Sequence, residues 1–71
     1  MTIKLGIYIH FKGGHYEAIS LASHSETLEQ MVVYRSLQDP SQTWVRPMSL
    51  WNENVEKNGQ TIKRFTYIDE I

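Results

Sequence analysis

The pair Gly13-Gly14 stands between two runs rich in β-branched and aromatic residues. Residues 3–11 precede it and residues 15–23 follow it. Strands favour such side chains because they fit a pleated surface, whereas a tight turn needs residues that tolerate positive φ. The pattern predicts a β-hairpin, and the rest of the chain continues in the same way.

Further strands are predicted over residues 30–37, 43–46, 52–56 and 60–68. Asn58-Gly59 favours a type I′ hairpin turn between the last two. Pro47 ends one strand and suits the start of a 3₁₀ or helical turn. We therefore expect one mainly β domain over residues 1–71, an SH3-like barrel of five or six short antiparallel strands. An open α+β sheet is the alternative.

Residues 15–23 carry apolar side chains at both odd and even positions, including Ala18, Ile19 and Leu21. A flat strand with one buried face would alternate more cleanly. The mixed pattern favours a strand that curls, so that its orientation changes along its length.

Composition narrows the functional classes. The chain has no cysteine, which excludes disulfides and thiolate metal sites. Its net charge is −1, and no cluster of Lys and Arg of the kind that grips nucleic acid non-specifically is present. No apolar run approaches the ~20 residues that cross a bilayer, and no signal-peptide pattern is seen. The expectation is a cytoplasmic protein without membrane contact.

Trp44 and Arg46 form the most suggestive pair, because alternate residues of a strand share a face. An indole beside a guanidinium can stack on a base or hold a carboxylate or phosphate. Tyr34 and His10 are candidate neighbours. The competing interpretation is that the tryptophan fills the core and that Arg46 pairs with a carboxylate such as Glu53.

The histidines suggest a different chemistry. His10 and His15 flank the predicted glycine turn, where two imidazoles could converge on a metal ion. His24 and Glu26 add residue types used in catalysis, but neighbours in sequence rarely reach the geometry of a catalytic triad. No residue is therefore assigned as catalytic or metal-binding, and no cofactor is expected.

Several motifs occur in a characteristic order: residues 8–16, residues 22–27, Val32-Val33-Tyr34, Trp44-Val45-Arg46-Pro47, and Asn58-Gly59 followed by Arg64-Phe65. The succession resembles a family of short bacterial domains, domain of unknown function 1653, over about Tyr8 to Phe65. The resemblance implies one compact bacterial domain. It carries no catalytic or binding residues to this chain.

The expected function is that of a binding module rather than an enzyme. Its ligand would be a peptide, a nucleotide or a nucleic-acid segment, held by Trp44, Arg46, Tyr34 and His10. One alternative is an assembly protein that forms a homodimer through the same surface, since a small chain with exposed aromatic residues gains from self-association. A second alternative is a metal-dependent enzyme that uses the histidines.

Overall fold

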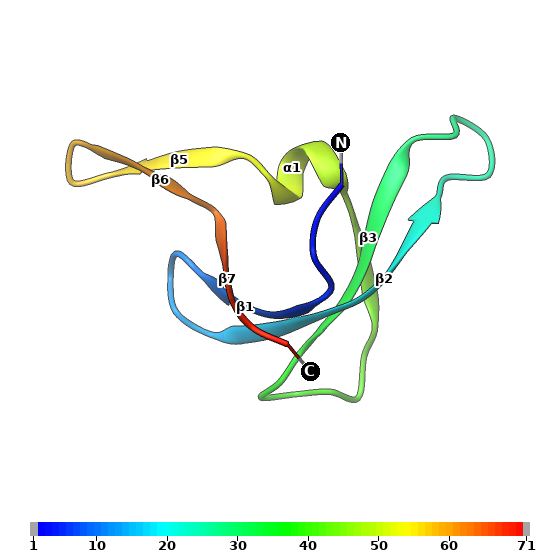
Figure 1. Cartoon of the computed structure of the whole chain (residues 1–71), viewed down its shortest axis with the longest axis horizontal. Coiled ribbons are helices and arrows are strands. Elements are labelled where there is room, and N and C mark those ends of the chain that lie inside the picture. The colour runs from blue at the N-terminus through cyan, green and yellow to red at the C-terminus, as the bar shows by residue number, and fades with distance from the viewer. Residues whose placement is uncertain (1, 71) are drawn as a thin grey trace.

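The computed structural model describes residues 2–70 of the chain (Figure 1). The elements in chain order are β1 (Gly6–His10), β2 (His15–Ser23), β3 (Gln30–Ser36), β4 (Trp44–Pro47), α1 (Met48–Trp51), β5 (Asn54–Lys57), β6 (Gln60–Lys63) and β7 (Phe65–Asp69). All strand pairs are antiparallel. The mainly β class and the short helical turn after Pro47 are thus confirmed.

Five strands form one sheet in the order β4-β3-β2-β1-β7, and β5 and β6 form a separate hairpin. Within residues 2–70, the outer strands β4 and β7 do not pair with each other, so the sheet stays open. A barrel requires that closure, and the expected SH3-like barrel is not confirmed. Met48 and Trp51 of α1 instead pack against part of the inner face of the sheet.

The expected long strand over residues 60–68 is two strands. β6 pairs with β5 up to Asn54↔Lys63, whereas β7 pairs with β1 from His10↔Phe65 onward. Arg64 lies at the bend between them, and its backbone N–H donates to the Glu53 carbonyl oxygen at 2.9 Å. The strand leaves the hairpin at this residue and joins the main sheet.

Both predicted glycine turns are present. Gly13 and Gly14 have φ of 93° and 85°, a region that side chains disfavour. Asn58 and Gly59 have φ of 53° and 78°, the two positive angles that a type I′ turn requires.

A bulge in β2 explains the mixed pattern of that strand. Ala18 pairs with Tyr34, but the next pair is Ser20↔Val33, so Ile19 is an extra residue on its strand. Because of this residue, Leu21 lies on the same face as Ala18 and packs against the core. The strand therefore directs even positions to the inner face before the bulge and odd positions to that face after it.

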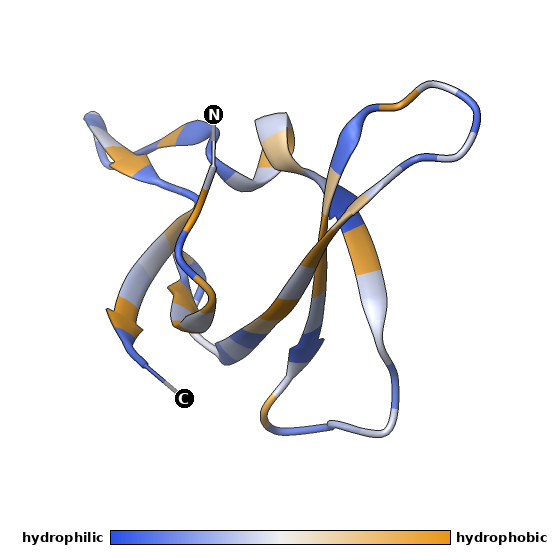
Figure 2. Cartoon of the chain, turned by 45° about the vertical axis from the view of Figure 1, so that its right-hand side comes forward, coloured by the Kyte–Doolittle hydropathy of each residue, from blue (hydrophilic) through white to orange (hydrophobic). Residues whose placement is uncertain are grey.

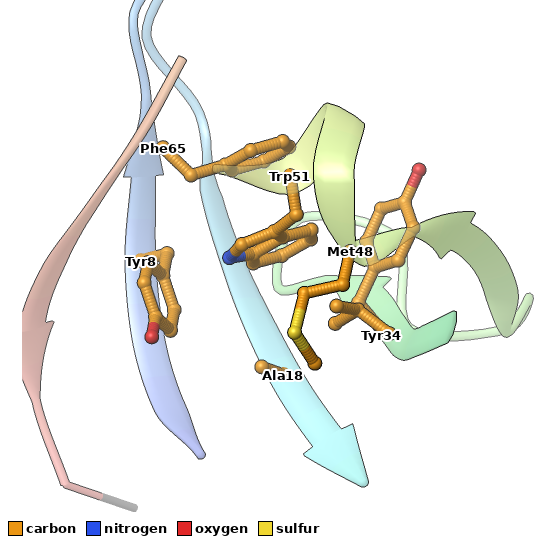
Figure 3. Close-up of a cluster of buried hydrophobic side chains, with 7 residues drawn as sticks. Tyr8, Ala18, Tyr34, Met48, Trp51 and Phe65 are labelled. Carbon is orange, nitrogen blue, oxygen red and sulfur yellow. The ribbon is translucent and has the colours of Figure 1, made fainter. Parts of the chain in front are cut away.

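The core lies between the inner face of the sheet and α1 (Figure 3). Trp51 is only 1% exposed, and its indole stacks on the Phe65 ring with centroids 3.8 Å apart. Tyr8 and Tyr34 meet the indole edge-on at 5.2 and 5.0 Å.

The hydropathy colouring shows hydrophobic and hydrophilic residues alternating along the strands and a mostly polar tip of the β2–β3 hairpin (Figure 2).

Candidate ligand-binding face

The candidate face begins on β4, an outer strand of the sheet. In the register of β4 against β3, Trp44 lies opposite Tyr34 and Arg46 lies opposite Val32. Since Tyr34 and Val32 both belong to the core, Trp44 and Arg46 lie on the inner face of the sheet. The two side chains therefore share one face of the strand.

Arg46 lies over the aromatic core. Its guanidinium carbon is 5.5 Å from the centre of the Phe65 ring and 5.9 Å from that of Tyr34. Its Nε donates to the Tyr34 hydroxyl at 3.4 Å, a long contact. These ring contacts hold the charge in place, and within residues 2–70 the guanidinium makes no further side-chain hydrogen bond.

No carboxylate neutralises Arg46 among residues 2–70. The ion pairs there join Arg35 to Glu17 at 2.9 Å and Arg64 to Glu53 at 3.3 Å. The alternative expectation of an ion pair between Arg46 and Glu53 is therefore wrong. The bend before β7 places Arg64 beside Glu53, and these two residues form the ion pair.

Trp44 is the exposed member of the face. It is 40% exposed, whereas the tyrosine behind it, Tyr34, is 6% exposed. The two rings meet edge-to-face at 5.8 Å, and the Trp44 Nε1–H donates to Gln42 Oε1 at 3.1 Å. One tryptophan thus lies at the surface on an ordered support, while Trp51 fills the core.

His10 reaches the same face from β1. It pairs with Phe65, and the two rings are 4.9 Å apart. Its Nδ1 accepts a hydrogen bond from the Lys12 backbone N–H at 3.2 Å, so a neutral ring carries its proton on Nε2. Burial lowers the pKa of His10, and the nearby charges of Arg46, Arg64 and Lys12 lower it further.

The four predicted residues lie on one face and are linked through two rings: Tyr34 contacts Trp44 and Arg46, and Phe65 contacts Arg46 and His10. Tyr34 is a buried support rather than a contact surface. Phe65 and Arg64 were missed as parts of the face. Their place depends on the bend at Arg64 and on the register of β7 against β1, and neither has a local signal in the sequence.

The structure does not bring the histidines together. His15 pairs with Ile9, so it leaves the sheet on the face opposite to His10. His24 follows the far end of β2, where its Nδ1 accepts hydrogen bonds from the backbone N–H groups of Glu26 and Thr27. In the described part of the chain, no three His, Cys, Asp or Glu side chains gather as metal ligands would.

The inner face and its helix define a small β domain with a mixed aromatic and cationic surface. The sequence profile of DUF1653, described as a protein of unknown function, matches residues 6–67. The chain belongs to this family. A crystal structure of a DUF1653 protein from Bordetella bronchiseptica is similar, with a TM-score of 0.87 and 35% sequence identity over 97% of this chain and 91% of that one.

No curated protein matches the chain. Among residues 2–70, no helix has the length and apolar character to cross a membrane.

Proposed function

We propose that this protein is a binding module and that its ligand contacts the face formed by Trp44, Arg46 and His10, with Tyr34 as support. One observation carries the proposal: Arg46 is held over two aromatic rings, with no carboxylate partner among residues 2–70, on the same face as an exposed indole. An ordered cation next to an exposed ring favours recognition of a partner that offers an anionic or polar group and a flat surface.

The test is a titration of nitrogen-15-labelled protein with nucleoside monophosphates and with short acidic, basic and aromatic peptides. We expect at least one probe to shift the amide signals of Trp44, Arg46 and His10 together. The double variant Trp44→Ala/Arg46→Ala should lose that response while keeping a dispersed amide spectrum. Unchanged binding in the folded double variant would contradict the proposal.

A matched control uses the same strand. Val45 is 59% exposed and lies between the two residues, on the opposite face of β4. Val45→Ala should leave the response to each probe unchanged. If this variant and the double variant lose the response equally, the strand as a whole is responsible and the face is not.

A second candidate function is homodimer formation. It is supported by β4, which among residues 2–70 pairs with β3 alone and carries Trp44 and Val45, both exposed. The outer edge of such a strand offers backbone hydrogen-bonding groups to the same strand of a second copy. Sedimentation at increasing concentration tests this, and a dimer that Val45→Lys dissociates is the expected outcome; a protein that stays monomeric at high concentration contradicts it.

A further inference from the structure

Three cations from different parts of the chain each lie over an aromatic ring that the His10 ring also contacts. Arg46 comes from β4, Arg64 from the bend before β7, and Lys12 from the turn after β1. Of these three cations, Arg64 is the one that forms an ion pair among residues 2–70, and its partner is Glu53. The excess of positive charge at this face contrasts with the net charge of −1 of the whole chain.

The cations follow a line of rings. Arg46 lies over Phe65, and the His10 ring lies 4.9 Å from Phe65 and 4.6 Å from Phe11. Arg64 and Lys12 lie 5.8 and 5.7 Å from the centre of the Phe11 ring. The positive charge is therefore held along one path on ordered supports, which favours an anionic ligand and disfavours a cationic one such as a methylated lysine.

Trp44 adds a second requirement to the ligand. Its ring lies 5.8 Å from the Tyr34 ring, and the Arg46 guanidinium carbon lies 5.9 Å from the centre of that same ring. The exposed indole and the guanidinium therefore flank one tyrosine ring, and a ligand that reaches both needs a flat ring and an anion joined by a short link. A flat ring stacked on Trp44 can thus place an attached anion at the Arg46 guanidinium.

We propose that the ligand is a nucleoside phosphate, with its base stacked on Trp44 and its phosphate held by Arg46 beside His10. The inference rests on the proposed function and specifies its ligand class. Free nucleotides and nucleotides within a single strand offer the same chemistry. The few cations of this face suit one or two phosphates rather than a long duplex, which proteins hold through many phosphate contacts.

The experiment compares AMP, adenosine and ribose 5-phosphate as probes of the labelled protein. We expect AMP to shift the amide signals of Trp44, Arg46 and His10 and to bind about tenfold more tightly than either fragment, because each fragment lacks one of the two contacts. Equal affinity of AMP and ribose 5-phosphate would overturn the role of Trp44.

Two variants assign the contacts. Arg46→Gln should weaken AMP binding by about tenfold or more and leave adenosine binding nearly unchanged. Trp44→Leu should weaken AMP and adenosine binding alike. The control Lys63→Gln makes the same change of charge at an exposed position of the separate hairpin, and it should have no effect. An Arg46→Gln protein that binds AMP as well as the wild type does would overturn the proposal.

A pentanucleotide distinguishes the two sources of the ligand. Binding much tighter than that of AMP, with further amides shifted, indicates a single strand, whereas equal binding indicates a free nucleotide. Failure of the inference is also distinct from failure of the proposed function. If peptides shift this face and no nucleotide does, the binding module stands and the nucleoside phosphate is rejected; if no probe shifts it, both fail.

Discussion

Trp51 shows how a short helix can close the core of an open sheet. Its indole is enclosed by Phe65, Tyr8 and Tyr34, each in direct ring contact. Within residues 2–70 its N–H has no hydrogen-bond acceptor, and the nitrogen edge is directed toward the Tyr8 ring (Figure 3). Packing of rings, rather than polar contacts, therefore holds this residue.

Removal of this ring should be costly. Trp51→Ala should lower the free energy of unfolding by about 3–5 kcal/mol, because the sheet cannot collapse into the space left behind. Urea unfolding followed by circular dichroism measures the change. Its neighbour Leu50 is 45% exposed, and Leu50→Ala should change the stability by less than about 0.5 kcal/mol. If Trp51→Ala does not fold, the milder Trp51→Phe should still lose roughly 1–3 kcal/mol.

His10 makes stability depend on pH. Its pKa in the folded protein is lower than the ordinary value of 6.5, so the unfolded chain takes up the proton first as the pH falls. The contribution to stability is therefore complete above about pH 6.5 and is lost as the pH falls from the unfolded pKa through the folded one. Urea midpoints at about pH 7.5 and about pH 5.5 measure the loss.

The variant His10→Gln separates this effect from other titrations. We expect its stability to fall less between the two pH values than that of the wild type. His15→Gln, at an exposed position on the opposite face, should behave as the wild type does. Equal losses in wild type and His10→Gln would rule out His10 as the source.

At the scale of elements, the outer face of the β2–β3 pair contains a cross-strand ion pair. Glu17 is directly opposite Arg35, and its carboxylate is nearly buried while Arg35 is partly exposed. Arg35→Gln should lower the free energy of unfolding by about 1–3 kcal/mol, because it leaves a buried carboxylate without its partner. Thermal and urea unfolding report the change.

The more exposed pair between Arg64 and Glu53 is the comparison. Glu53→Gln should cost less than about 1 kcal/mol, since water replaces the lost contact. Adding Glu17→Gln to Arg35→Gln should restore part of the stability, because the buried charge is then gone. A double variant less stable than Arg35→Gln alone would show that the carboxylate is not the source of the loss.

Local signals predicted several elements correctly. Gly13-Gly14 and Asn58-Gly59 specify their turns through backbone angles that few other residues adopt, and Pro47 marks the change from strand to helix. The bend at Arg64 has no such signal, because it depends on which neighbour each half of the segment finds. The open sheet likewise depends on long-range contacts of α1. A helix of four residues is too short for its sequence to predict those contacts.

The candidate site divides in the same way. Alternation along one strand is enough to place Trp44 and Arg46 on a common face. Their meeting with His10 depends on the order of five strands and on the register of β7 against β1. Such pairings join residues far apart in sequence. The sequence therefore suggested His10 as a neighbour of Arg46, but it did not predict that Phe65 lies between them and contacts both.

At the scale of the molecule, stability should be uneven. The β5–β6 hairpin extends away from the main sheet (Figure 1), and in the described part of the chain its two strands pair with each other alone. Isolated two-stranded hairpins are marginally stable in water. Amides of β5 and β6 should therefore exchange with deuterium much faster than those of Ala18 and Val32, which are fully buried in the centre of the sheet.

Hydrogen exchange measured by NMR tests this prediction under native conditions. The control is the Gly13-Gly14 hairpin, whose strands β1 and β2 belong to the main sheet. Its strand amides should be protected like the rest of the sheet. Equal protection of β5–β6 and of the central strands would mean that the whole molecule opens as one unit.

The bulge at Ile19 gives β2 one residue of spare length. If that residue were lost, Ser20 would stay opposite Val33, and every later side chain would keep the side it has now. Loss of one residue from a regular part of a strand instead moves every later side chain to the opposite face of the sheet. Natural or engineered changes of length should therefore be accepted at this point and rejected elsewhere in the strand.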